Sequence, residues 1–347
     1  MTLLIILAAD AAAVNRASAV LRAGRLVAFP TETVYGLGAD ATDPAALAAI
    51  FAAKGRPVNH PLIVHLSDAS ELDRWGRDIP PSAHLLAEAF WPGPLTLVLG
   101  RGENISLAAT GGRASVGLRV PDHPVALALL RATGRPVAAP SANRFGRVSP
   151  TTAAHVAAEF AAGAVGGHGA IGPEIILDGG ACRVGVESTI VELTGSEPTL
   201  LRPGGVSAQA IEAVLGRALH PASGPSRASG MLASHYAPQT ALEVVGASEV
   251  LAAVAAHQAG GRRVVVLGAS SDLAASLVSS GIVSSGIVAA MVLEPVDSTE
   301  EYARVLYRRL READELGVDC ILAVAPAAAG LGQAIADRLA KAAAPRP

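Results

Sequence analysis

The sequence has 347 residues, a length that suits two domains of about 100–200 residues each. Hydrophobic residues make up 51% of the chain, enough for large cores, and the net charge of −3 excludes a global field that would attract nucleic acid or an anionic membrane. No apolar run approaches the ~18 residues of a membrane span, and two distant cysteines favour inert thiols in a reducing compartment, so we expect a soluble cytoplasmic protein.

Strand and helix signals alternate from residue 1 to about residue 216. Met1–Ala9 has no basic segment and predicts a first strand rather than a signal peptide. Asp10 and Asp43-Pro44 are typical helix starts, and Gly24 and Gly55 follow the ends of those helices. The predicted helices are 10–21, 43–54, 80–91, 122–132 and 151–162, and the later strands are 26–29, 62–66, 95–99, 115–120, 136–139, 175–178, 188–193 and 199–201.

Residues 217–239 are rich in Pro, Ser, Gly and Ala, which predicts a linker that ends in the distinctive His235-Tyr236-Ala237-Pro238. From 240 to 347 strands and helices alternate again, typical of a small parallel sheet flanked by helices. A pentapeptide at 278–282 recurs at 283–287, and we interpret it as a local duplication in a loop. The strands predicted here are 241–245, 263–267, 289–293 and 320–324, and the helices are 247–258, 271–279, 299–314 and 330–343.

The most informative segment follows the apolar run 26–29. Thr31, Glu32, Thr33 and Tyr35 come in quick succession, with glycines at 36 and 38. Such side chains can line a pocket, and glycines let the backbone approach a ligand where a Cβ would collide. A plain connecting loop is the alternative, although Asn, Asp and Ser would be more usual there. The segment therefore predicts the wall of a binding site.

Two further segments suggest an anion site. Lys54 and Arg56 follow a helix end, where they either complement the helix dipole or form a phosphate clamp. Ser141 and Asn143 follow a short strand, where ligands of open α/β sheets bind, although Ser-x-Asn is also common in turns. No phosphate-binding loop and no metal-ligand spacing is present, so scattered side chains would have to hold any nucleotide.

Arg119 and His65 lie within apolar strand patterns. A charge such as Arg119 must there be paired or reach a ligand, and the residues alone leave an ion pair and a ligand contact open. His65 by itself is more typical of a satisfied core histidine than of a ligand contact.

Taken together, eight segments resemble the YrdC-like family of threonylcarbamoyl-AMP synthases. They span about residues 10–205 in the family's order, and the tail after the His-Tyr-Ala-Pro linker resembles the two-domain branch. The resemblance implies an α/β fold: a catalytic domain over 1–216 with a twisted mixed sheet and helices around a concave pocket, a linker or lid over 217–239, and a Rossmann-like domain over 240–347. The segments are Pro30–Leu37, Lys54-x-Arg56-Pro57, Pro61–His65, Trp91–Thr96, Arg119–Pro121, Ala139–Asn143, Glu187–Ile190 and Leu201–Gly204.

The resemblance implies a nucleotidyltransferase that joins L-threonine, bicarbonate or CO2, and ATP into threonylcarbamoyl-AMP and pyrophosphate. Mg²⁺ would accompany ATP without a protein metal site. Partner proteins would use the product for threonylcarbamoyladenosine formation in tRNA, and whether this chain contacts tRNA is left open. An RNA-binding module and a carbamoyl-transferring relative with another acceptor are the alternatives, and the acidic net charge counts against the first.

The resemblance also implies roles for individual residues. The basic-polar tetrad around the phosphates comprises Lys54, Arg56, Ser141 and Asn143, and the nucleotide is also held by Ser115, Ser149, Arg202 and Tyr236. L-threonine is bound by Arg119 in bidentate fashion, with Thr33, His65, Ala139 (through its backbone) and Ser188. Glu32 is either a buried partner of an arginine or a catalytic group. Ala228-Ser229-Gly230-Met231 lacks the proline usual before His-Tyr-Ala-Pro, which would loosen a lid closed by Tyr236.

Overall fold

The computed structural model describes residues 4–161, 172–223, 235–280 and 290–345. By their internal contacts they belong to two compact units, residues 1–145 with 149–231 and residues 146–148 with 232–347. The domain boundaries expected at 216 and 239 stay predictions. Most of the duplicated pentapeptide and all of Ala228–Met231 lie outside the described residues. None of the helices that are described is both long and apolar enough to cross a bilayer.

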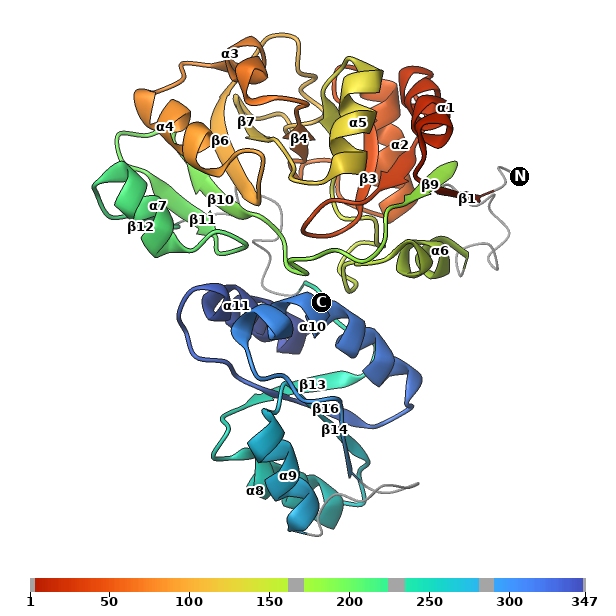
Figure 1. The fold of residues 1–347 in the computed structure, drawn as a ribbon, viewed down its shortest axis with the longest axis vertical. Coiled ribbons are helices and arrows are strands. Elements are labelled where there is room, and N and C mark those ends of the chain that lie inside the picture. Colours follow the sequence, from red (N-terminus) through yellow and green to blue (C-terminus); the bar gives the residue numbers. More distant parts are fainter. Residues whose placement is uncertain (1–3, 162–171, 224–234, 281–289, 346–347) are drawn as a thin grey trace. The chain divides into compact units, whose positions relative to one another are not determined.

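The strands described in the first unit form one mixed sheet of twelve strands, in the order β1-β9-β2-β3-β8-β4-β7-β6-β10-β11-β12, with β5 paired to β6 (Figure 1). The sheet contains parallel pairs, such as β4 with β7, and antiparallel pairs, such as β6 with β7, which confirms the predicted mixed sheet. The strands are β1 (Ile5–Ala8), β2 (Val27–Phe29), β3 (Gly36–Asp40), β4 (Ile63–His65), β5 (Gly76–Arg77), β6 (Leu95–Arg101), β7 (Ser115–Arg119), β8 (Val137–Ala138), β9 (Ile175–Asp178), β10 (Thr189–Glu192), β11 (Thr199–Arg202) and β12 (His220–Pro221).

Several helices of this unit begin where a side chain caps the first turn. The Asp10 carboxylate accepts the Ala13 N–H at the start of α1, Asp43 caps α2 in the same way, and Gly55 ends α2 with a left-handed φ of 63°. The helices of this unit are α1 (Ala11–Arg22), α2 (Pro44–Lys54), α3 (Leu72–Trp75) after the 3-10 turn Ala69–Glu71, α4 (Pro81–Phe90), α5 (Pro124–Thr133), α6 (Ala153–Ala161) and α7 (Ala208–Leu215).

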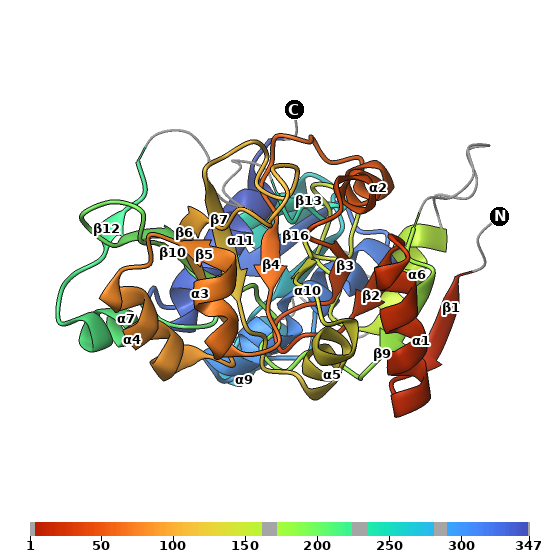
Figure 2. The ribbon, with the colours of Figure 1, turned by 90° about the horizontal axis from the view of Figure 1, so that it is seen from above.

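The sheet has an apolar cluster on each face because successive side chains of a strand point to opposite sides. Phe29 packs in one cluster with Leu21 of α1 and Leu129 of α5, two helices that lie against one another (Figure 2). Ala28 packs in the other cluster, with Leu47 of α2. Each leucine buried in this way stabilises the fold by about 1.5–3 kcal/mol. Packing on both faces therefore fixes the position of β2, the strand that precedes the Thr31–Thr33 segment.

The glycines after the Thr31–Thr33 segment were expected to admit a ligand, and for this pair the expectation is wrong. Gly36 and Gly38 lie within the buried strand β3. A Cβ on Gly38 would stand 2.8 Å from Cε1 of Phe29 and 2.9 Å from Cγ1 of Val137. The glycines therefore make room for the Phe29 ring inside the core rather than for a ligand.

The second unit has the predicted parallel α/β fold. Its described strands pair in the order β13-β16-β14-β15, and all three pairings are parallel. Helices α8 and α9 cover one face of this sheet, and α10 and α11 cover the other (Figure 1). The elements are β13 (Ala241–Val245), α8 (Val250–Ala259), β14 (Val264–Leu267), α9 (Ser271–Ser279), β15 (Ala290–Val292), α10 (Thr299–Glu315), β16 (Cys320–Val324) and α11 (Leu331–Ala343).

Candidate active site

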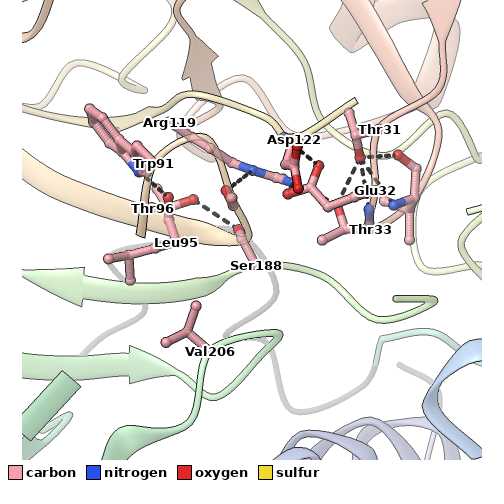
Figure 3. Close-up of polar contacts among 12 residues, drawn as sticks. Thr31, Glu32, Thr33, Trp91, Leu95, Thr96, Arg119, Asp122, Ser188 and Val206 are labelled. Carbon is pink, nitrogen blue, oxygen red and sulfur yellow. Dashed lines mark hydrogen bonds and ion pairs between the residues drawn. The ribbon is translucent and has the colours of Figure 1, made fainter. Parts of the chain in front are cut away.

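The segment after β2 is a tight turn that directs polar side chains inward. The Thr31 hydroxyl oxygen accepts the N–H groups of Thr33 and Val34, each at 3.2 Å, and donates to the Val34 carbonyl oxygen at 2.7 Å. It also lies 2.8 Å from the Thr33 hydroxyl. Because the turn is held by its own side chains, Glu32 and Thr33 have fixed positions facing Arg119 (Figure 3).

Arg119, at the end of β7, is held by hydrogen bonds from two of its guanidinium nitrogens to protein groups. Its Nη2 donates to Oε1 of Glu32 at 2.6 Å and to the Thr33 hydroxyl at 3.0 Å, and its Nε donates to the Gly93 carbonyl at 3.2 Å. The second carboxylate oxygen of Glu32 accepts the Asp122 N–H at 3.0 Å. Arg119 is therefore in an ion pair, and Glu32 is the buried partner. Within the described part of the chain, Nη1 bonds no protein group and is the edge left for a ligand.

His65 lies next to Arg119, because β4 and β7 pair in a register that matches these two residues. Burial, reinforced by the Arg119 guanidinium, lowers the pKa of His65 from 6.5 to about 3, so the imidazole is neutral. Backbone hydrogen bonds with Val137 and Ile63 oppose this shift, and the buried Nδ1 has no partner among the described residues by strict hydrogen-bond geometry. The core-histidine and ligand-contact alternatives for His65 therefore both stay open.

Ser188 and Arg202 form a second polar group at this edge of the sheet. The Ser188 hydroxyl lies 2.8 Å from that of Thr96, and both stand close to Arg119 in Figure 3. Arg202 donates from Nε and Nη2 to the Ser188 carbonyl oxygen, at 3.1 and 2.9 Å, and from Nη2 to the Ser188 hydroxyl at 3.2 Å. Arg202, predicted for the nucleotide, thus directly positions Ser188, which was predicted for threonine.

Lys54, the last residue of α2, reaches the loop that carries two other tetrad members. Its Nζ donates to the backbone carbonyl of Ser141 at 2.6 Å and to that of Asn143. Burial holds the pKa of Lys54 well below its usual value, and Arg56 lowers it further, while Glu159 opposes both. The Lys54 ammonium group bonds carbonyl oxygens of another loop rather than those at the end of α2, so the helix-dipole alternative does not describe it.

Arg56 completes the group around Lys54. Its Nη2 donates to the Pro61 carbonyl oxygen at 3.0 Å, and its guanidinium lies 5.8 Å from the centre of the Phe145 ring. The Phe145 N–H in turn donates to the Lys54 carbonyl oxygen at 2.8 Å. The loop after β8 and the end of α2 are therefore joined by backbone and side chain, and the structure brings the four predicted tetrad residues together.

Ser115 lies at the other end of β7 from Arg119. The two residues are four positions apart along the strand, about 13 Å at ~3.3 Å per residue. The Ala139 N–H is already used by the Ile63 carbonyl at 2.9 Å, so a backbone contact with a ligand would fall to its carbonyl oxygen. Ser149 donates to Oε1 of Glu187 at 2.7 Å, next to Ser188 in sequence.

Tyr236 is described within the second unit. Its ring stacks on that of Tyr307, with centroids 5.8 Å apart, and the Arg338 guanidinium lies 5.2 Å from its centroid. Its φ of 61° is unusual for a tyrosine, which shows that its surroundings fix the backbone there. The contact of Tyr236 with a nucleotide stays a prediction.

Thr96 and Glu187 have no role predicted from the sequence, although both stand inside the segments that carry the family resemblance. Thr96 bonds Ser188, and Glu187 bonds Ser149. A sequence reader could have noticed Thr96 and Glu187 because they stand in segments that carry other site residues. Their hydrogen-bond partners, however, could not be inferred from the sequence.

Two family models match the chain. Residues 19–204 match the model of Sua5, YciO and YrdC proteins, described as telomere recombination, and residues 206–344 match the model described as threonylcarbamoyl-AMP synthase, C-terminal domain. The chain belongs to the threonylcarbamoyl-AMP synthase family. The resemblance expected from the sequence is therefore confirmed.

Relatives within the family match along nearly the whole chain. The threonylcarbamoyl-AMP synthase of Pyrococcus abyssi is 43% identical over 338 residues, which cover 94% of this chain and 92% of the relative. That of Bacillus subtilis is 41% identical over 339 residues, covering 95% and 92%. A crystal structure of P. abyssi Sua5 complexed with L-threonine superposes with a TM-score of 0.85 at 39% identity, covering 99% of this chain and 98% of that one. The predicted fold is confirmed by this match.

Proposed function

We propose that this chain is a threonylcarbamoyl-AMP synthase that transfers the adenylyl group of ATP to a carbamate of L-threonine. Membership of the family and near-complete coverage of two curated relatives support the activity. The L-threonine complex of P. abyssi Sua5 supports threonine as a substrate. The product, threonylcarbamoyl-AMP, would pass to partner proteins that modify adenosine in tRNA. A cytoplasmic location fits the two free, buried cysteines.

The observation that carries the proposal is the pair of separate cationic groups in the first unit. Arg119 is buried beside the neutral His65 and keeps Nη1 for a ligand, and Lys54 and Arg56 are buried around the loop after β8. A reaction of two anions needs two such groups. The carboxylate of threonine suits Arg119, and the phosphates of ATP suit Lys54 and Arg56.

The chemistry needs little covalent help from protein. The amine of threonine attacks bicarbonate, and a carbamate and water form; with CO2, a proton leaves instead. A carbamate oxygen then attacks the α-phosphorus of ATP, and the bond from that phosphorus to the bridging oxygen of pyrophosphate breaks. In this scheme Lys54 and Arg56 bind and orient the phosphates and stabilise the charge that develops on the transferring group.

The contact of Arg119 with the threonine carboxylate would differ from the expected bidentate one. Both hydrogens of Nη2 and the one on Nε of Arg119 are already donated, to Glu32, Thr33 and Gly93. We therefore propose that Nη1 alone binds the carboxylate and that the other protein contacts hold the guanidinium still. We also propose that the buried Nδ1 of His65 meets a polar group of the same substrate.

Mg²⁺ would enter as part of the ATP complex, held by phosphate oxygens. The groups around Lys54 suit this role, since they are cations and backbone carbonyls rather than a pair of free carboxylates. The bound ion would supply charge neutralisation to the phosphates, and the protein residues would position them.

The test is pyrophosphate release by the purified full chain, with threonine, bicarbonate and ATP each omitted in turn. We expect release to require all three and to fall at least ~100-fold in Lys54→Ala, the scale of losing one preorganised donor. Lys341→Ala is the matched control because the chain has two lysines and Lys341 pairs with Asp337 in the second unit. Release without threonine but with another acceptor would favour the carbamoyl-transferring alternative. Unchanged release in Lys54→Ala would refute the phosphate role.

A further inference from the structure

Three potential metal ligands from distant parts of the sequence meet in the second unit. Glu243 lies in β13, His257 near the end of α8 and Cys320 at the start of β16. One ligand atom from each lies within 4.8 Å of the other two. Their gaps along the chain match no metal-binding spacing, so only the fold reveals this group.

The three side chains are carried by elements that pack firmly together. β13 and β16 are hydrogen-bonded neighbours, in a register that pairs Ala241 with Cys320. α8 covers this part of the sheet, since Val250 and Val254 share an apolar cluster with Cys320. Ligands on a helix and two paired strands have little freedom to move apart, which is the preorganisation that a metal site needs.

The distances suit a small tetrahedral ion after a modest adjustment. Metal–ligand bonds of about 2.0–2.3 Å place neighbouring ligands of zinc ~3.4–3.6 Å apart. Nε2 of His257 already lies 3.0 Å from Oε2 of Glu243. The widest gap in the group is at most 4.8 Å, so closing it takes a shift of about an ångström by rotamer changes.

The donor set selects the kind of cation. A thiolate, an imidazole and a carboxylate together suit Zn²⁺, whereas Mg²⁺ and Ca²⁺ need oxygen ligands. The thiol is buried, but the Glu243 side chain is 52% exposed and that of His257 13%, so water can reach a fourth position. We propose that Glu243, His257 and Cys320 form a zinc site with water as the fourth ligand. Binding replaces the thiol proton, which leaves to solvent, and no electron transfer is involved.

Cobalt(II) is the probe, because a thiolate ligand gives it a near-ultraviolet charge-transfer band and tetrahedral geometry gives intense visible bands. The full chain is first stripped with a chelator and then titrated with Co²⁺. We expect both bands to saturate at one ion per chain and to vanish on addition of Zn²⁺. Zn²⁺ should also raise the thermal midpoint of the second unit by several degrees, since it binds the folded state.

Variants separate the site from adventitious binding. Cys320→Ser should abolish the charge-transfer band, and Cys182→Ser, which changes the chain's other cysteine, should keep it. His257→Ala removes a partly exposed ligand and should lose both the visible bands and the thermal shift even if the Cys320 variant folds poorly. His84→Ala is its control, because His84 pairs with Asp73 at 3.4 Å on the surface and belongs to no group of three potential metal ligands among the described residues. A charge-transfer band that survives Cys320→Ser, or wild-type protein that gives no such band, overturns the proposal.

Discussion

Glu32→Gln keeps the shape of a buried side chain and removes the charge that faces Arg119. The carboxylate accepts two hydrogen bonds, from Nη2 of Arg119 at 2.6 Å and from the Asp122 N–H at 3.0 Å. An amide has one acceptor oxygen, so one of these donors must face the new NH2 group. The Glu32 side chain is fully buried and that of Arg119 is 5% exposed, so water cannot replace the lost acceptor.

The expected loss follows from this geometry. At an effective dielectric constant of about 20, unit charges 2.6 Å apart attract by roughly 6 kcal/mol, and the solvation of both groups in the unfolded chain offsets part of it. Breaking a buried pair by removing one partner costs about 3–5 kcal/mol. We expect the free energy of unfolding of the first unit to fall by that amount, a large share of the ~5–15 kcal/mol usual for a domain.

Urea unfolding can isolate this effect because both tryptophans, Trp75 and Trp91, belong to the first unit and their fluorescence reports on that unit. The matched control is Glu197→Gln, whose Arg217 partner stands 3.4 Å away on the surface. There the same chemical change should cost at most about 1 kcal/mol. If Glu32→Gln shifts the unfolding midpoint no further than Glu197→Gln does, at equal slope, the ion-pair reasoning is refuted.

Three more predictions concern protonation and packing. Because the pKa of Lys54 is lowered in the free protein, ATP binding should take up protons and weaken as pH rises. Calorimetry in buffers of different ionisation enthalpy measures this proton uptake. An uptake that persists in Lys54→Ala would contradict the prediction. The pKa of His65, about 3, lies below its unfolded value of ~6.5, so His65 should add stability above that pH and lose it as pH falls toward 3. Its NMR resonance should not titrate between about pH 5 and 8, and a midpoint near 6.5 would contradict the burial argument. Gly38→Ala should lower the free energy of unfolding by about 1–3 kcal/mol, because the new Cβ overpacks against Phe29. Gly36→Ala should lower it less, since the nearest neighbour of its Cβ would be 3.2 Å away. Equal losses measured by urea unfolding would refute the packing explanation.

Much of the fold was predictable because its signals are local. Asp10 and Asp43 cap their helices within three residues, and Gly55 ends α2 by its own left-handed backbone. β3 was missed for the opposite reason. Gly38 has no side chain to show that it lies in a strand, and its neighbours Phe29 and Val137 reach it only through the sheet.

The site, like the fold, was predictable where the signal is local and not where contacts join distant parts of the chain. The sequence singled out Arg119 and Lys54 as charges in apolar surroundings, but it could not name their partners. Glu32 is 87 residues from Arg119, and the Ser141 carbonyl is 87 residues from Lys54. A backbone carbonyl carries no residue type at all, so no sequence pattern could mark it as an acceptor. The pairing of β4 with β7, which sets His65 beside Arg119, likewise belongs to the tertiary fold.

The hold on Lys54 has a further consequence for an enzyme that makes a reactive mixed anhydride. Such a product acylates free amines, and this chain has two ε-amines. That of Lys341 is bonded to Asp337, and that of Lys54 gives hydrogens to the carbonyls of Ser141 and Asn143. With phosphate bound, Lys54 would be an ammonium without a lone pair, and therefore no nucleophile. The contact that holds the substrate would then also protect the enzyme from acylation by its own product.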